Sequence, residues 1–309
     1  MRISTTWHQQ LGVNAMLQQQ SKLSETQLKL SSGQKYLTPA ENPGAATNLI
    51  DLQQNIKENE QYQVNIDAAK QRLELQESSL SNATDTLQRI RVLTVQSLND
   101  TNTAENRIQI AFEIDQLNEH LMSIANTQNA NGEYIFSGYK SDQPAYSYNS
   151  TTGYSYDGDP NSRRSITIGP NDRVVTDGDP GNQVFGEIPV PPPVPAETPG
   201  GFSNIFQAIA QLSSDLKTNK PDSHSLTDLD QAMQRIDTTR ASTGARLHAL
   251  ENQENLNADF ILDNQTTASE IGDLDYAEAI SQFNLQQISL QAAQQAYTKV
   301  QKLSLFNYL

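Results

Sequence analysis

The sequence contains no cysteine in its 309 residues. Disulfide bonds, thiolate metal sites and cysteine nucleophiles are therefore excluded. Because cysteine is a rare residue, its absence can be chance, but it also suits a protein that crosses compartments of different redox state unfolded. The fold has to be held by packing and hydrogen bonds alone.

Basic residues are also scarce, with 21 Lys and Arg against 36 Asp and Glu, a net charge of −15. Nucleic acids and anionic membrane surfaces recruit clusters of cations, so we expect no nucleic-acid partner and no membrane partner. No stretch approaches the roughly 18 apolar residues of a membrane span. The first residues lack the apolar core of a secretory signal. We expect a protein that is cytosolic or exported without a cleaved signal peptide.

Apolar residues are fewer than in most globular chains, at 36%, and aromatic residues make up only 6%. Typical domains are about 45–50% apolar when glycine is included. A low apolar fraction indicates much surface for little volume. The composition therefore favours a thin helical rod over one thick core.

Residues 49–98 carry the clearest periodicity. Leucines and other residues recur every seven positions from Leu52 to Leu87, and a second series lies three residues later, from Ala69 to Ile90. This a/d spacing is typical of long helices that pack along a seam. The pattern predicts one helix of roughly 75 Å.

A second seam follows at residues 110–124, with apolar steps of four and three. Residues 99–102 form a predicted turn, Asn102 with Glu105 resembles a capping box, and Asn131-Gly132 suits the end of the second helix. Two seams joined by a short turn predict an antiparallel helical hairpin.

Residues 139–186 change character. Tyrosines at 146, 148, 154 and 156 alternate with polar residues, as in strands, and D-G-D-P recurs at 157–160 and 177–180 as a predicted turn. Strand packing is the favoured interpretation of the tyrosines; a carbohydrate-binding surface is the alternative. A proline-rich stretch at 189–199 predicts an extended linker.

Helical patterns resume at Ser203 and again over residues 225–262. Beyond that range, Thr266-Thr267 and Gly272 argue against continuity of the helix into the last segment. The predicted fold is mainly α, a long antiparallel helical or coiled-coil rod from both chain halves with a small inserted β-rich module. We expect three domains, which are a terminal-helix polymerisation domain (1–41 plus 271–309), a helical rod domain (42–138 plus 200–270) and a β-rich outer domain with its linker (139–199).

Both ends carry amphipathic helical patterns. An isolated helix with one apolar stripe is marginal in water, so each end has to pack against something. Packing of both ends into one bundle within the chain is one solution, and contact with other subunits is the other. The second predicts these assembly residues: Met16, Leu23, Leu30, Leu274, Leu285, Ile288, Ala292, Leu303 and Phe306.

No pattern in the sequence supports catalysis or a cofactor. The four histidines share no metal-ligand spacing. The acidic turn at 157–161 begins like a calcium loop, but Ile168 stands where the loop needs a glutamate. We expect no catalytic residues, no metal and no cofactor.

Several motifs resemble the bacterial flagellins and their hook-associated relatives. LSSGQK at 30–35 and PAENPGAA at 39–46 resemble the N-terminal signature of that family. NGEYIFSGYK at 131–140, DYAEAI at 275–280 and LSLFNYL at 303–309 are similar to blocks of the hook–filament junction members. Between about 140 and 270 the resemblance is loose.

The resemblance implies a structural subunit that leaves the cell unfolded through the flagellar type III export channel. It implies an export chaperone that binds the C-terminal segment, and assembly with other copies, with the first hook-associated junction protein and with flagellin. The location implied is the extracellular flagellum.

Three alternatives stay open from sequence. Filament flagellin is the nearest, although Pro43 stands where flagellins usually carry an acidic–alanine run. A secreted coiled-coil binding protein or type III effector is the second, and an enzyme comes last because no acid–base or nucleophile set can be assembled.

Overall fold

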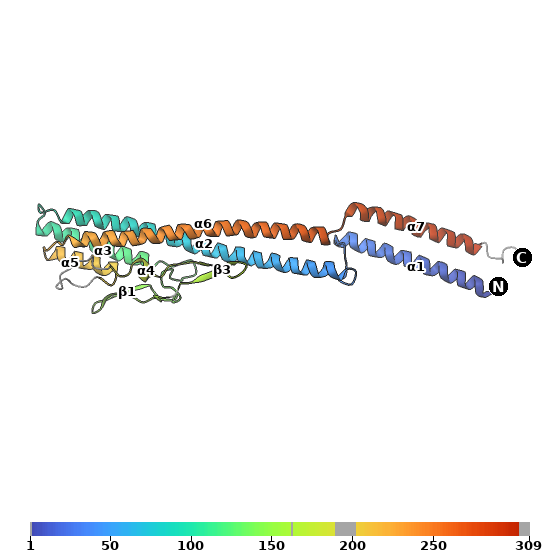
Figure 1. Cartoon of the computed structure of the whole chain (residues 1–309), viewed down its shortest axis with the longest axis horizontal. Helices are drawn as coiled ribbons and strands as arrows, with labels where there is room; N and C mark the ends of the chain where they lie inside the picture. Colours follow the sequence, from blue (N-terminus) through green and yellow to red (C-terminus); the bar gives the residue numbers. More distant parts are fainter. Residues whose placement is uncertain (1, 162, 189–201, 303–309) are drawn as a thin grey trace. The chain divides into compact units, whose positions relative to one another are not determined.

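The computed structural model describes residues 2–161, 163–188 and 202–302 (Figure 1). Its helices are α1 (Arg2–Ser32), α2 (Pro43–Ser97), α3 (Ala104–Ala125), α4 (Gly181–Val184), α5 (Ile205–Lys217), α6 (His224–Gly272) and α7 (Tyr276–Lys302). Its strands are β1 (Tyr146–Asn149), β2 (Gly153–Tyr156), β3 (Ser165–Gly169) and β4 (Arg173–Thr176). The predicted fold class, mainly α with a small β module, is confirmed. The predicted proline-rich linker lies outside the described residues.

The chain divides into two compact units, unit 1 (residues 1–59 and 259–309) and unit 2 (residues 60–258). Both α2 and α6 contribute a segment to each unit. The division into three domains at 1–41 plus 271–309, 42–138 plus 200–270 and 139–199 stays a prediction.

The helix boundaries in unit 1 follow local chemistry. Gly33 ends α1 with a φ of 72°, a conformation that favours glycine. Asn42 caps α2, because its Oδ1 accepts a hydrogen bond from Ala45 N at 3.1 Å. Pro43 then occupies the first helical position, as the sequence predicts.

Three predicted boundaries are wrong. The N-cap of α3 is Thr103, whose hydroxyl accepts from Asn106 N, rather than Asn102. The same helix ends at Ala125 with Asn126 as C-cap, so Asn131-Gly132 lies in a later loop.

The third correction concerns α6, which continues past the expected end near residue 262 to Gly272, although the expected break before the last segment is confirmed because α7 begins only at Tyr276. Thr266 and Thr267 do not interrupt it, because their hydroxyls donate to Leu262 O at 2.8 Å and Asp263 O at 2.9 Å. Hydroxyls that bond back to the preceding turn are satisfied inside a helix.

The seam predicted in α2 is the core of unit 2. Seam positions at 66, 69, 73, 76, 80, 83, 87 and 90 are all 0% exposed. The neighbouring α3, α5 and α6 supply the facing apolar residues, including Ile114, Leu121, Phe206 and Ile236. Figure 1 shows these helices side by side along α2.

Each β-hairpin of unit 2 lies against a different pair of helices. In β1–β2, Tyr146 pairs with Tyr156 and Tyr148 with Tyr154, and Tyr146 contacts Phe206 of α5 at 4.7 Å between ring centroids. The β3–β4 hairpin packs on α2 and α6. A Cβ at Gly169 would lie 2.9 Å from Gln253 Nε2, so this close approach to α6 requires glycine.

Buried polar groups fix the second D-G-D-P segment, which is an extended connection rather than the predicted turn, to the helices. Gln76 Nε2 donates to Asp179 Oδ2 at 3.0 Å and to Thr243 Oγ1 at 2.9 Å, and Arg246 forms two bonds with Asp179 at 2.8 and 2.9 Å. Asp179 is 4% exposed. Since a buried carboxylate needs partners, this network holds the module in one position on α2 and α6.

Candidate assembly surface

The helices α1 and α7 pack antiparallel within unit 1 (Figure 1). Leu274 N donates to Gly33 O at 2.9 Å at one end of the pair. In the middle, Thr26 Oγ1 donates to Gln286 Oε1 at 2.9 Å. Toward the far end, a Cβ at Gly12 would lie 3.2 Å from the Tyr297 ring.

The α1 contact positions 12, 19, 26 and 33 are seven residues apart. Met16, Leu23 and Leu30 fall between them at alternating steps of four and three, and all three are half-buried. These predicted assembly residues therefore lie on the seam that α1 forms with the chain's own α7. Their role in contacts between subunits stays a prediction.

On α7 the residues that face α1 follow the same spacing, and they were not among the predicted assembly residues. Ala279 is 5% exposed, and the other seam positions, half-buried, are Phe283, Gln286, Leu290, Ala293 and Tyr297. Steps of four and three from 279 to 297 were the available signal, although Gln286 interrupts the apolar pattern. Thr26 compensates for that interruption by bonding to the glutamine.

The apolar stripe predicted on α7 is a second, separate face. At 100° per residue, Leu285, Ile288 and Ala292 lie about 145° around the helix from the seam. Leu285 and Ile288 are each 63% exposed, and Ala292 is exposed as well. We call Leu285, Ile288 and Ala292 the outer face of α7.

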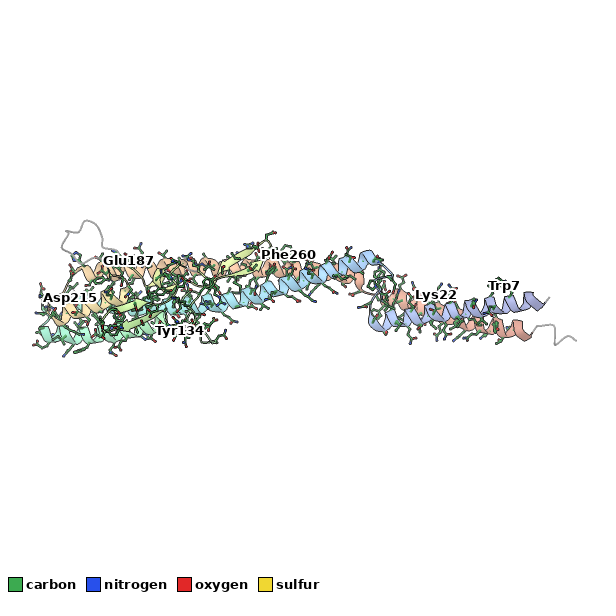
Figure 2. The ribbon with its side chains drawn as sticks, turned by 90° about the horizontal axis from the view of Figure 1, so that it is seen from below. Trp7, Lys22, Tyr134, Glu187, Asp215 and Phe260 are labelled. Atoms are coloured by element: carbon green, nitrogen blue, oxygen red, sulfur yellow. The ribbon has the colours of Figure 1, made fainter. Side chains whose placement is uncertain are left out.

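Of the three remaining predicted positions on the C-terminal segment, the structure describes one. Leu274 is half-buried just before α7 begins. Leu303 and Phe306 lie outside the described residues. On α1, Trp7, Leu11, Leu17 and Leu28 are 64%, 47%, 59% and 55% exposed, and Figure 2 shows Trp7 and Lys22 along this helix.

An ion pair braces the start of the α1–α2 connection. Lys29 Nζ lies 2.8 Å from Glu41 and 3.0 Å from Glu25. The hydrogen bond that Lys29 donates to Glu41 is the main cause of the raised pKa of Lys29, and the same bond lowers the pKa of the Glu41 carboxyl. Glu41 also accepts from Leu37 N and Thr38 N, so it closes the turn.

The described part of the chain offers little else that could act as a functional centre. Its histidines, aspartates and glutamates form no group of three that could hold a metal ion. None of its helices is long and apolar enough to cross a membrane. An exposed apolar face on a pair of helices is suited to packing against a further helix.

Comparison with known proteins gives matches at both ends and along the whole chain. The bacterial flagellin N-terminal helical region matches residues 3–141, and the bacterial flagellin C-terminal helical region matches residues 226–309. The chain is 28% identical to flagellar hook-associated protein 3 of Escherichia coli and 27% identical to that of Salmonella typhimurium, in each case over 99% of both chains.

Solved structures share the fold. Flagellar hook-associated protein 3 from Legionella pneumophila is similar over 71% of this chain and 98% of its own, with a TM-score of 0.63 and 23% identity. FlgL from Xanthomonas campestris is similar over 71% of this chain and 99% of its own, with a TM-score of 0.62 and 19% identity.

Proposed function

We propose that this chain, which belongs to the bacterial flagellin family, is a structural subunit at the hook–filament junction of the flagellum. In this role it adapts the hook side to the flagellin filament and polymerises through its terminal helices. Similarity to hook-associated protein 3 over the full length of the chain supports the junction in particular. The proposed role is structural and requires no catalytic residue.

The observation that carries the proposal is the outer face of α7. The seam with α1 is already occupied, yet Leu285 and Ile288 remain 63% exposed. Full burial of an exposed leucine or isoleucine contributes about 1.5–3 kcal/mol, so covering these two side chains from 63% exposure contributes about 2–4 kcal/mol per subunit. The proposed occupant is a terminal helix of a neighbouring copy, and Leu274, Leu303 and Phe306 are proposed to extend the same contact.

The proposed partners are those that the similarity to hook-associated protein 3 implies. In the assembled flagellum they are other copies of the chain, the first hook-associated junction protein on the hook side and flagellin on the filament side. Before assembly, an export chaperone covers the C-terminal segment, because exposed apolar residues such as Ile288 otherwise aggregate. Export through the flagellar type III channel brings the chain to its extracellular site.

Filament flagellin is the competing function. Overexpression separates the two, because a flagellin extends into long filaments whereas a junction subunit stays short or monomeric on its own. Long filaments built from this chain alone would reject the junction in favour of flagellin.

Deletion of the gene from its source bacterium tests the proposal directly. We expect intact hooks, no filaments and flagellin released into the medium, with recovery when the gene is restored. Cells that keep normal filaments and motility after the deletion would contradict the proposed function.

Substitutions in α7 test the surface itself. Leu285→Asp with Ile288→Asp should leave the helix content unchanged and abolish incorporation, because charge replaces the apolar contact. Gln287→Asp, an exposed polar position between them, is the matched control and should incorporate normally. Normal incorporation of the double variant would leave the outer face without a role.

A further inference from the structure

A groove of about 550 Å³ opens in unit 2 between α3 and the β1–β2 hairpin. Tyr148 and Tyr154 line it from the hairpin, with ring centroids 4.8 Å apart. Its lining from α3 includes Phe112, Asp115, Asn118 and Glu119.

One end of the groove already binds a cation of the chain. Lys217 Nζ, from the end of α5, lies 2.5 Å from Asp115 Oδ2 and 5.5 Å from the centroid of the Phe112 ring. A carboxylate beside an aromatic face is a favourable site for a positive charge. The structure thus shows what this combination of side chains binds.

The other end repeats the combination without a cation. Glu119 lies four residues after Asp115 and therefore on the same side of α3. It is exposed, and its carboxylate forms no hydrogen bond or ion pair with the described residues. The Tyr148 ring, which lines the same groove, is 60% exposed. Burial, then Tyr148, Asp115 and Glu119, raise the pKa of Tyr154, consistent with negative potential there.

The groove is rich in acceptors and poor in donors. Asn118, 3% exposed, uses its amide hydrogens on the Tyr154 hydroxyl at 3.2 Å and on Phe206 O at 3.1 Å. Its Oδ1 has no partner among the described residues. A guanidinium has five donors, no acceptor and a flat face that stacks on a ring, so it matches Glu119 and Tyr148 better than an anion or a neutral hydroxyl does.

We propose that this end of the groove binds the guanidinium of Arg173 from a neighbouring copy of the chain. Every other arginine with a described side chain has an ion pair or hydrogen bond within the chain. The side chain of Arg173 has neither with the described residues and is exposed directly after the Asn171–Asp172 turn. This contact rests on the proposed function, because it needs copies in an assembly.

The placement of the two patches suits a contact between successive copies. Arg173 is on the β3–β4 hairpin and the groove is beside β1–β2, and Figure 1 shows the two hairpins at different positions along α6. One copy then offers its hairpin and the next its groove, and such a heterologous contact repeats along a helical row. Copies that each carry −15 repel one another, so an opposite-charge contact also orients their encounter.

Charge exchange in the full-length chain tests the contact. In a strain that lacks the native gene, Glu119→Arg or Arg173→Glu should each lower incorporation about tenfold, the effect of losing one well-placed interfacial charge pair. The double variant Glu119→Arg with Arg173→Glu should recover most of the loss. Asp100→Arg, an exposed carboxylate in the α2–α3 turn, is the matched control and should change nothing.

Cross-linking gives an independent measurement, because the natural chain has no cysteine. Gln116→Cys lines the groove and Val174→Cys is 55% exposed beside Arg173. Copies of the two variants, expressed together, should give a cross-linked dimer with a short bis-maleimide only in assembled flagella.

The outcomes separate this contact from the proposed function. If the unaltered chain is absent from the hook–filament junction, the proposed function fails. If the chain is present there but the charge variants incorporate normally, or no cross-link forms, only the Arg173 contact fails. Circular dichroism of each variant, unchanged from the unaltered chain, excludes misfolding as the cause of a loss.

Discussion

The α2 seam of unit 2 and the α1–α7 seam of unit 1 have the same residue spacing but are buried to different extents. From Ile66 to Ile90, the α2 seam positions are 0% exposed. In the α1–α7 seam, only Thr26 and Ala279 are buried. The difference comes from the covering layers, because α3, α5, α6 and two hairpins surround α2 in unit 2.

This comparison shows what a heptad pattern determines. The spacing sets which side of a helix packs, and the number of neighbours sets how much of that side is removed from water. Two helices with only each other leave much of their surface exposed. Because α1 covers only the seam side of α7, the outer apolar face of α7 remains exposed to solvent.

Core truncation should give the largest difference between the two seams. Leu80→Ala should lower the free energy of unfolding of unit 2 by about 2–5 kcal/mol, because it leaves a cavity in a sealed core. Leu23→Ala, half-buried in α1, should cost about 1 kcal/mol or less. Calorimetry on both variants measures this, and equal shifts in Tm would contradict the comparison.

The polar contacts of the two regions should differ by a smaller amount. Asp179→Ala should cost about 2–3 kcal/mol in unit 2, since it removes the carboxylate partner of Arg246 and one of the two acceptors of Gln76 Nε2 in a buried site. Thr26→Ala should cost about 1 kcal/mol, because Gln286 is half-buried and can turn to water. Urea unfolding followed by circular dichroism, with Asp142→Ala as the exposed control, compares them.

The pH response should be the smallest difference and opposite in sign. Hydrogen bonding to Lys29 lowers the pKa of Glu41, so its stabilising contribution is present above about 4.5 and lost as pH falls through its folded pKa. Burial raises the pKa of Asp177, so its contribution is present below about 3.8 and lost as pH rises through its folded pKa. Carbon-13 NMR titration of both carboxyls measures the two directions, and a Glu41 midpoint above its ordinary value of 4.5 or an Asp177 midpoint below its ordinary value of 3.8 would contradict them.

Much of the fold follows from local pattern. The α2 seam, the tyrosine hairpin and the N-cap at Asn42 are each set by residues close in sequence, and all three are confirmed. The errors at Asn131-Gly132 and Thr266-Thr267 arose where a turn-forming or β-branched residue was weighed without its partners. Tertiary contacts override such weak propensities.

The candidate surface could be predicted only in part. The outer face of α7 follows from its 3.6-residue period, and its residues are exposed. That Met16, Leu23 and Leu30 face the chain's own α7 was one of two solutions left open, because sequence alone does not decide whether two segments more than 240 residues apart pair with each other or with another chain. The groove at Glu119 was also missed, since it combines α3 with a hairpin distant in sequence.

The hydrogen bond between Thr26 and Gln286 has a consequence for how the outer face is presented. A slip of α7 by one helical turn, about 5.4 Å, would set each of these polar groups against an aliphatic neighbour. Together with the bond from Gln19 Nε2 to Gln286 O, this bond therefore sets the register between the first and last helices. This register determines where Leu285 and Ile288 lie along and around the helix pair. Every copy therefore presents the same outer face of α7 to its neighbour.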